Sequence, residues 1–529
     1  MGGFHLSRDY GQICRYILSE HGPLLGSELQ HLLIQRANVK ANNARQIILR
    51  LRENKTLLCT EPVKFTKNQL LYFLPKQNIN KKLLEVIPDH AQTFHRLYQA
   101  LCEQDGFLLW SEFCKISSGV IDKETNQNKK SVYEIYLDMR HLGLLQEIEV
   151  FNQTQIVIAN DKWVPRVDAS YPKVYQRLRE TAFNKQITGD LLKWLEKMNI
   201  AGYNATYLTE DEDWKGYNGY YWDAIAYSYL WGLYKTNKRE STLNPSEDKT
   251  GSLILVESII HREMKLYDLS GFISRVGVLQ AKLQVRDNFR IIPVCFVQSM
   301  EEEALKLARK RGIMIISVTE VFGSKLAETL KTVRNLDPRN IDAEALVKVL
   351  EAADASGHDG KLGSLKGYVF NFLVTSIFNN FGFSCKMGVK YDFSGEKCEC
   401  DVWISVDEEY LIVCEAKGYN EGNEVQLGEH ENDKDTVKKF FERTCRIVSK
   451  ASGKEVLPVF ITSGSFSNEA LEYLQKKNES KKIKRLMNNK NFPGSVYYDR
   501  NALFDLFANK QLYSEHKKIL KEFFRDHKK

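Results

Sequence analysis

The first part of the chain alternates hydrophobic and polar residues first with a helical period and then with a strand period. Apolar residues three or four positions apart share one face of a helix, whereas those two apart share one face of a strand. Within residues 1–78 this pattern predicts three helices and then two strands, at Asp9–Glu20, Gly26–Gln35, Asn42–Glu53, Leu57–Cys59 and Leu70–Leu74. Three helices followed by a two-stranded hairpin predict a winged-helix domain.

Residues 87–162 repeat this plan more loosely. The predicted helices and the hairpin that follows them lie at Ala91–Cys102, Leu109–Ile116, Lys130–Leu142 and Gln146–Ala159. Asn152 and Gln153 stand at the predicted bend of the hairpin, where polar residues of this kind are favoured. We therefore expect a second winged-helix domain.

From residue 166 onward, buried strand-like runs alternate with helices, which is typical of α/β domains. In residues 166–335 the strands are predicted at Tyr220–Tyr229, Leu253–Ile260, Arg290–Val297 and Ile313–Val318, with helices at Leu269–Leu283 and Met300–Arg311. In residues 342–529 the predicted order is helix (Leu365–Phe381), three strands (Ser384–Tyr391, Cys400–Val406, Tyr410–Ala416), helix (Thr436–Ser449), strand (Val456–Thr462), helix (Asn468–Lys476) and strand (Ser495–Tyr498). A chain of 529 residues is too long for one core, so the expected fold is multidomain, α followed by α/β.

Two acidic residues and a lysine stand at the ends of neighbouring predicted strands. Asp401 precedes the run that continues to Val406, and Glu415 ends the apolar run that begins at Tyr410. Because residues two apart share one face of a strand, Glu415 and Lys417 point the same way. Two carboxylates and an ammonium group that converge suit a hard divalent cation and an activated water, which is the chemistry of phosphodiester hydrolysis.

The element order of residues 363–500, with Asp401 at one strand and Glu415-Ala416-Lys417 ending the next, resembles the PD-(D/E)xK, or restriction-endonuclease-like, nuclease superfamily. The resemblance implies that Asp401, Glu415 and the backbone carbonyl of Ala416 bind Mg²⁺, which Mn²⁺ can replace. It also implies that Lys417 orients or deprotonates the attacking water and stabilises the charge on the phosphate. Many members carry a glutamate where this chain has Asn371 or a neighbour. The alternative is a solvated Glu415–Lys417 ion pair.

The middle α/β segment carries a weaker form of the same motif. Asp223 lies within the predicted strand Tyr220–Tyr229 and Glu257 ends the apolar run of the next one, but Ile259 occupies the position of the lysine. An aliphatic residue cannot activate water or stabilise phosphate charge, so we expect a degenerate, inactive copy that serves as a dimer surface or a DNA clamp. The alternative is that Lys265 or His261 takes over the role.

The outer face of the third predicted helix is polar and basic. It carries Lys40, Asn42, Asn43, Arg45, Gln46 and Arg50, the residue types that reach bases and phosphates. In the second winged helix the corresponding cations are Lys129 and Lys130, joined by Arg140. We expect DNA contacts from both domains. A winged helix that contacts protein instead remains open for each of them.

Two charged segments follow the candidate site. The acidic one contains Glu421, Glu424, Glu429, His430, Glu431, Asp433 and Asp435. It is interpreted as a solvated loop, with extra metal ligation or a gate over the site as the alternative. Lys438, Lys439, Arg443, Arg446 and Lys450 are predicted to share a broad helix face, which either follows a phosphate backbone or is simply solvated.

Composition narrows the function only slightly. The net charge of +7 permits nucleic-acid binding without requiring it. The ten cysteines are sparse and lie mostly in apolar runs, which suggests a reducing compartment, and Cys398 and Cys400 lack the second pair that a zinc site needs. Neither a long apolar run nor an N-terminal signal pattern is present, so a cytoplasmic location is expected.

These observations together predict a Mg²⁺-dependent DNA endonuclease that acts in restriction, anti-phage defence or mobile-element processing. One intact motif per chain suggests a homodimer. The sequence contains no phosphate-binding glycine-rich loop of the ATPase type, so an ATPase or defence-complex subunit would be a separate partner. The alternative function is a non-catalytic DNA-binding regulator or scaffold with inert nuclease folds, and RNA as the substrate also remains open.

Overall fold

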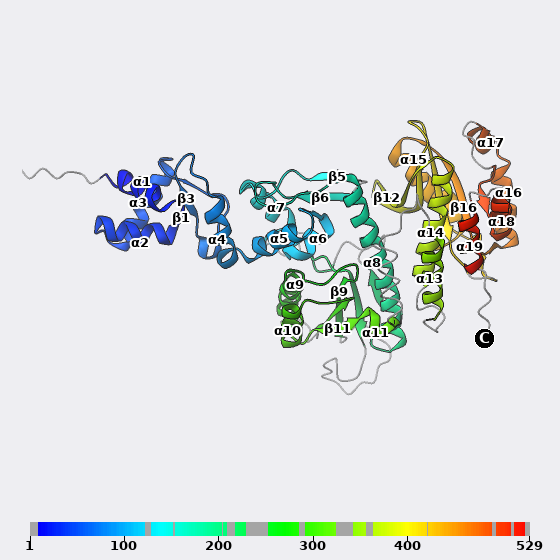
Figure 1. Ribbon diagram of the computed structural model, residues 1–529, viewed down its shortest axis with the longest axis horizontal. Coiled ribbons are helices and arrows are strands. Elements are labelled where there is room, and N and C mark those ends of the chain that lie inside the picture. Colours follow the sequence, from blue (N-terminus) through cyan, green and yellow to red (C-terminus); the bar gives the residue numbers. More distant parts are fainter. Residues whose placement is uncertain are drawn as a thin grey trace, which may run out of the picture. The chain divides into compact units, whose positions relative to one another are not determined.

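The computed structural model shows a mixed α/β protein with several sheets (Figure 1). It describes residues 9–121, 129–151, 154–203, 205–208, 217–228, 252–284, 291–323, 342–355, 363–419, 422–488, 494–508 and 513–523. The contacts divide the chain into two compact units. The first unit contains residues 1–169, with 218–221 and 267–275, and the second contains the remainder.

The N-terminal part of the first unit has the element order that the sequence predicts. It consists of α1 (Tyr10–His21), β1 (Leu24–Leu25), α2 (Gly26–Ala37), α3 (Ala41–Glu53), β2 (Leu58–Cys59), a 3₁₀ turn (Thr66–Asn68) and β3 (Leu71–Phe73). The Asp9 side chain accepts hydrogen bonds from the first turn of α1, and Asn38 ends α2 in the left-handed conformation. The strands form an antiparallel sheet in the order β1-β3-β2, and Leu29, Leu33 and Ile48 lie in the core.

The next part of the first unit repeats this order. It comprises α4 (Asn80–His90), α5 (Gln92–Glu103), β4 (Phe107–Leu109), α6 (Trp110–Ser117), α7 (Val132–His141), β5 (Glu149–Phe151) and β6 (Thr154–Ile158), with sheet order β4-β6-β5. Helix α4 was not predicted, although it buries Leu83, Val86 and Ile87. Helix α7 begins two residues later than predicted, so Lys130 precedes it. The predicted bend at 152–153 lies outside the described residues.

The second unit begins with a five-stranded mixed sheet. Its elements are α8 (Tyr171–Lys197), β7 (Thr206–Leu208), β8 (Ala224–Ser228), β9 (Ser252–Ile259), α9 (Leu266–Gln284), β10 (Ile291–Val297), α10 (Glu302–Lys310), β11 (Met314–Ser317) and α11 (Val318–Phe322). The strand order is β11-β10-β9-β8-β7. Strands β7, β8 and β9 pair antiparallel, whereas β9, β10 and β11 pair parallel. The long helix α8 was not predicted, because apolar residues are spread around it instead of forming one stripe.

A second five-stranded sheet follows in the same unit. The elements up to its third strand are α13 (Ala343–Ala355), α14 (Gly363–Asn380), β12 (Ser384–Phe393), β13 (Glu396–Ser405) and β14 (Tyr410–Lys417). They are followed by β15 (Glu424–Val425), a π-helical turn η3 (Lys439–Thr444), α15 (Cys445–Ser452), β16 (Glu455–Thr462), β17 (Ser465–Phe466), α16 (Asn468–Asn478), α17 (Lys481–Asn488), β18 (Tyr497–Tyr498), α18 (Arg500–Ala508) and α19 (Ser514–Phe523). The strand order is β12-β13-β14-β16-β18.

The two large sheets share one topology. Each has a leading helix, three antiparallel strands and then two strands parallel to the third. The fourth strand of each sheet carries a proline followed by valine, and Pro293 pairs with Leu255 as Pro458 pairs with Val413. In the first sheet, Glu257 pairs with the residue two positions after Pro293. In the second sheet, Glu415 pairs with the residue two positions after Pro458. Residues 171–317 and 363–498 are therefore two copies of one structural plan.

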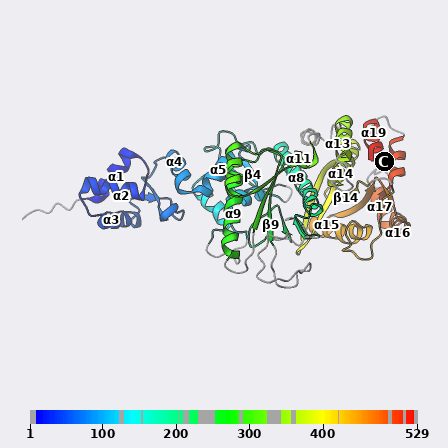
Figure 2. The same cartoon turned by 90° about the horizontal axis from the view of Figure 1, so that it is seen from below.

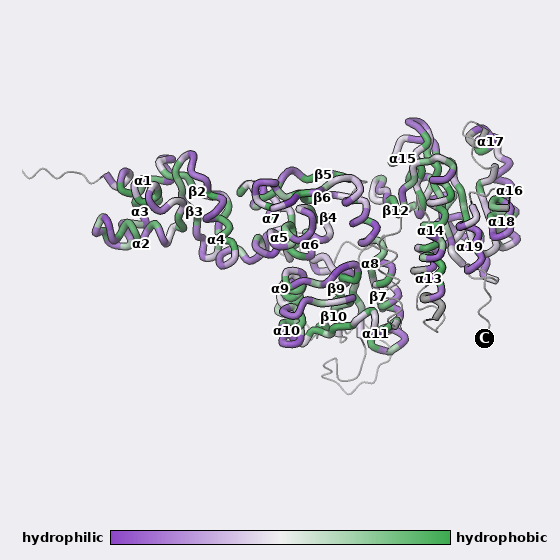
Figure 3. Tube along the Cα trace, in the orientation of Figure 1, coloured by the Kyte–Doolittle hydropathy of each residue, from purple (hydrophilic) through white to green (hydrophobic). Residues whose placement is uncertain are grey.

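The two copies pack together through their leading helices. Helices α8 (teal) and α14 (yellow-green) lie side by side in both ribbon views (Figures 1 and 2). The rings of Phe183 on α8 and Tyr368 on α14 meet edge to face, with their centroids 5.5 Å apart. One hydrophobic core contains both helices and the strands of both sheets, and the hydrophobic colouring in Figure 3 follows those strands. Because residues of both α/β segments share this core, the boundaries expected at 166–335 and 342–529 stay a prediction.

Candidate active site

The sheet brings Asp401 and Glu415 together on adjacent strands. In the antiparallel register of β13 and β14, Val402 pairs with Cys414, so Asp401 and Glu415 stand one position further along. The backbone N–H of Ala416 donates a hydrogen bond of 2.9 Å to Oδ2 of Asp401. This bond fixes the Asp401 carboxyl beside the end of β14.

Lys417 completes the cluster from the last position of β14. Its Nζ lies 2.8 Å from Oε1 of Glu415 and 2.7 Å from Oδ1 of Asp435. Only 17% of each side chain of the Glu415–Lys417 pair is exposed. The three residues singled out in the sequence thus lie in one place, and an ion pair between Glu415 and Lys417 is present, although it is largely shielded from solvent.

Burial and mutual repulsion dominate the electrostatics of this cluster. Burial, and then the charge of Glu415, raise the pKa of Asp401 to about 7, although Lys417 and the Ala416 N–H act in the opposite direction. Burial by itself would lower the pKa of Lys417, but Glu415, Asp401 and Asp435 together raise it well above its ordinary value. Lys417 is therefore a fixed positive charge at neutral pH.

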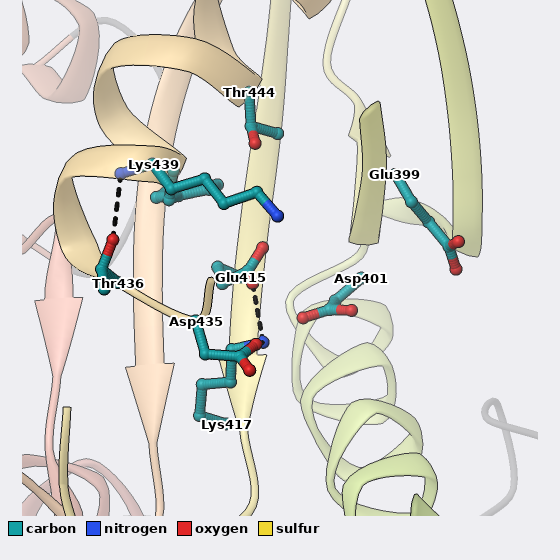
Figure 4. A pocket seen from close by; sticks show the side chains of 9 residues that line it. Glu399, Asp401, Glu415, Lys417, Asp435, Thr436, Lys439 and Thr444 are labelled. Carbon is teal, nitrogen blue, oxygen red and sulfur yellow. Dashed lines mark hydrogen bonds and ion pairs between the residues drawn. The ribbon is translucent and has the colours of Figure 1, made fainter. Parts of the chain in front are cut away.

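A polar cavity of about 280 Å³ opens over this cluster. Its lining residues are Glu399, Asp401, Glu415, Lys417, Asp435, Thr436, Lys439, Phe440 and Thr444. Figure 4 shows Asp401, Glu415, Lys417 and Asp435 turned toward one another, whereas the carboxylate of Glu399 lies farther away. Asn371, the counterpart considered for the missing glutamate, does not line this cavity.

The acidic segment contributes to the site through one residue. Asp435 is ion-paired with Lys417, although the sequence places it in a solvated loop. The loop is ordered locally, because Oδ2 of Asp433 accepts hydrogen bonds from the N–H groups of Glu429 (2.7 Å) and His430 (2.8 Å). Glu421 lies outside the described residues. Asp435 is 63% exposed, as expected for a solvated loop, and it also reaches Lys417 because the turn at Asp433 directs the chain back toward β14.

The predicted basic helix face does not form as one surface. Arg446 is paired with Glu396 and Glu431, and the Lys438 ammonium donates to the Glu429 carbonyl. Lys439 instead lines the cavity, because the π-turn at Lys439–Thr444 changes the direction in which successive side chains point. A sequence read with a regular helical period gives no signal for this change.

The donor set of the cavity is compatible with a hard cation. Mg²⁺ is usually held by one or two carboxylates and otherwise by water, and Asp401 and Glu415 are two adjacent carboxylates whose repulsion a cation would relieve. Over the described part of the chain, however, no group of three or more His, Cys, Asp or Glu side chains is arranged to hold a metal ion. A metal here would depend on two side chains, on the Ala416 carbonyl and on water.

The middle copy reproduces the anchoring hydrogen bond but buries the residues that correspond to Glu415 and Lys417. Oδ2 of Asp223 accepts a bond of 2.6 Å from the Ser258 N–H, as Asp401 does from Ala416. Glu257 and Ile259 are each only 1% exposed, so Ile259 stands buried at the position equivalent to Lys417. Lys265 forms ion pairs with Glu263 and Glu301.

The polar face predicted for the third helix is exposed. Asn42, Asn43, Arg45, Gln46 and Arg50 on α3 and Lys40 at its N-cap all face solvent. Lys40, Arg45 and Arg50 form no ion pair with other described residues. In the second repeat Lys129 is exposed, but Lys130 is paired with Asp138 and Arg140 with Glu147.

Comparisons with known proteins identify no relative. No family model, curated protein or solved structure matches this chain. Among the residues described, no helix is long and apolar enough to cross a membrane. All ten cysteines are free thiols.

Proposed function

We propose that this chain is a metal-dependent DNA endonuclease of the PD-(D/E)xK type. The observation that carries the proposal is the convergence of Asp401, Glu415 and Lys417 at the ends of two paired strands, beside a polar cavity. Any charged chain contains such residues at this spacing by chance. Their meeting on a sheet led by a helix, with the lysine held between carboxylates, is a much more demanding arrangement.

The roles of the residues follow from their charges. Asp401 and Glu415 would hold Mg²⁺ or Mn²⁺, helped by the Ala416 carbonyl, and the cation would supply Lewis acidity and an activated water. Lys417 is positively charged, so it can donate hydrogen bonds to a phosphate oxygen and stabilise developing negative charge. Its raised pKa makes it a poor proton acceptor, which favours the stabilising role over deprotonation of water.

DNA would be positioned by the first unit, whose two parts we interpret as winged helices. The exposed cations of α3 carry this assignment, because they have no protein partner among the described residues and are open to phosphates and base edges. Lys130 and Arg140 of the second part are balanced by Asp138 and Glu147, which makes α7 the weaker DNA candidate. The middle copy would be inert, because Ile259 replaces the lysine and is buried.

A non-catalytic, DNA-binding scaffold is the second candidate. One observation favours it: Lys417 pairs with both Glu415 and Asp435, so the ammonium group already serves as the partner of two carboxylates in an ion-pair network. A cellular role in restriction, anti-phage defence or mobile-element processing, a cytoplasmic location, and any dimer or ATPase partner belong to the proposal as consequences of nuclease function.

The deciding experiment compares cleavage with binding. Purified protein with Mg²⁺ or Mn²⁺ is expected to cleave DNA, and chelation is expected to stop it. Lys417→Ala and Asp401→Asn should abolish cleavage but retain DNA binding, whereas Lys397→Ala, a change at an exposed lysine in the same sheet, should have no effect. Equal cleavage by all variants would overturn the assignment. Calorimetry with Mn²⁺ that shows no heat dependent on Glu415 would favour the scaffold, and competition between DNA and RNA would identify the substrate.

A further inference from the structure

The helix that covers the cavity contains a π-helical turn at the cavity itself. The turn spans Lys439–Thr444 and leads directly into α15. π-Turns are rare in proteins. Those that do occur are frequently located at functional sites. Of the residues in this turn, Lys439, Phe440 and Thr444 all line the cavity.

The turn has a direct geometric consequence for two polar side chains. In a regular α-helix with 3.6 residues per turn, positions five apart lie on different faces. In a π-turn, hydrogen bonds join residues five apart, so Lys439 and Thr444 come close to alignment. Figure 4 shows the Lys439 side chain extending from the helix toward Glu415, with Thr444 above it.

Unlike three cations near it, Lys439 forms no ion pair and no hydrogen bond through its ammonium group in the part of the chain that the structure describes. Lys417 is ion-paired with Glu415 and Asp435, Lys438 donates to the Glu429 carbonyl, and Arg446 is paired with Glu396. The Lys439 ammonium makes no hydrogen bond or ion pair with any described residue, and its side chain is only partly exposed. A half-buried cation beside a cavity without a protein partner is available to an anion.

We propose that Lys439, positioned by the π-turn, binds the phosphodiester group of the substrate at this cavity. The inference rests on the proposed nuclease function and assigns to it a second cation. Lys417 is held by carboxylates at the floor of the site, so its charge is largely compensated. Lys439 lines the same cavity and forms no ion pair with a described residue, so a phosphate in the cavity would receive positive charge from Lys439 and hydrogen bonds from both ammonium groups. Phe440 and Thr444 complete the wall beside it.

The test measures DNA cleavage with Mg²⁺ over a range of salt concentrations. Lys439→Gln is expected to lower kcat/KM roughly tenfold, as the loss of one charged hydrogen bond would. It should also reduce the slope of log(kcat/KM) against log[salt] by about 0.9, the value for one phosphate contact on duplex DNA. Lys439→Arg should restore most of the activity. Lys438→Gln is the matched control, since it removes the same charge one position earlier, outside the cavity lining, and should leave the rate and the slope unchanged.

A change in salt slope separates phosphate binding from a structural role, since a variant that merely loosened the helix would lower activity at every salt concentration. Thermal unfolding of each variant checks that the fold is kept. If Lys439→Gln matches Lys438→Gln in rate and slope while Lys417→Ala is inactive, the inference fails and the nuclease assignment stands. If the unaltered chain does not cleave, the nuclease assignment fails and this inference fails with it.

Discussion

At the scale of single residues, position in the sheet gives similar side chains different properties. Asp401 and Asp223 each accept a hydrogen bond from the backbone one residue after a glutamate. The glutamate is partly exposed beside a lysine in one copy, and in the other it is buried two positions from an isoleucine. The anchoring of the aspartate therefore does not distinguish the copies. The copies are distinguished by Lys417 and by the partial exposure of Glu415.

This difference predicts the behaviour of Ile259→Lys. The new ammonium group would have to be buried beside Glu257, and the desolvation of such a pair commonly exceeds its attraction. We expect a loss of about 1–3 kcal/mol in the free energy of unfolding, measured by urea denaturation. Ile259→Leu, which conserves volume, should cost less than about 1.5 kcal/mol. Cleavage by an Ile259→Lys, Lys417→Ala double variant would contradict the view that the middle copy is closed.

At the scale of elements, α3 and α7 of the first unit differ in how far nearby acids balance their cations. Arg45 and Arg50 of α3 are exposed and without ion-pair partners among the described residues, whereas Lys130 and Arg140 near α7 are paired with Asp138 and Glu147. The two helices occupy the same place in the same element order, so topology alone does not assign DNA binding to either of them.

We predict that Arg45→Ala and Arg50→Ala in α3 each weaken DNA binding and reduce its salt slope by about 0.9. Lys130→Ala, the comparison in the second repeat, should have a smaller effect because its charge is already balanced by Asp138. Fluorescence anisotropy with a labelled duplex at several salt concentrations measures both quantities. An equal effect at Lys130 would show that α7 also contacts phosphates.

Helix α19 carries a buried titratable group. His516 is 1% exposed, and its Nε2 lies 3.0 Å from Oγ of Ser376 on α14. Burial lowers the pKa of His516 to about 4, although Glu515 raises it slightly. The folded state therefore resists protonation at a pH where the unfolded chain is protonated.

The expected result is a loss of stability on acidification. The contribution of neutral His516 to the free energy of unfolding is complete above a pH of about 6.5. It is lost as the pH falls toward about 4, and the total loss is at most about 3 kcal/mol. His516→Gln keeps a hydrogen-bonding group for Ser376 but cannot titrate. Urea unfolding at several pH values should show a steeper loss for the unaltered chain than for this variant, and parallel profiles would contradict the assignment.

At the scale of the whole molecule, the second unit contains two copies of one α/β plan that bury each other's leading helices. The face of α14 that α8 covers is therefore unavailable to another chain. Of the two copies, only the second has a lysine two positions after the glutamate, because the first has Ile259 there. Under the proposed function, one chain thus offers a single competent site to a duplex with two strands.

We predict that this arrangement cuts one strand at each visit. Supercoiled plasmid should first give open circles, with linear DNA appearing later, and the nicking rate should rise linearly with protein concentration. Gel electrophoresis of a time course measures both. Direct formation of linear product, with a rate that rises as the square of the concentration, would show instead that two chains act together. The homodimer suggested by the sequence would then be the active form.

Periodicity located most of the strands and many of the helices within a few residues, because side-chain burial repeats every two positions in strands and at helical spacing in amphipathic helices. It missed α8, which is buried on more than one face and so has no single apolar stripe. It also missed α4, where Leu83, Val86 and Ile87 lie in a short helix across the gap between the two domains predicted at 1–78 and 87–162. Local pattern identified the motif at Asp401, Glu415 and Lys417 because strand spacing is itself local.

The rest of the site depends on contacts that no local pattern contains. Asp435 reaches Lys417 because a turn at Asp433 brings the acidic segment back over β14, and Lys439 faces the cavity because of a π-turn. The burial of Glu257 and Ile259 in the middle copy likewise results from the packing of distant segments. The sequence by itself determines which charged residues share one face at a strand end, because the backbone geometry of a strand places every second side chain on the same face. Which charges meet, and which are shielded from water, depends on how distant segments pack.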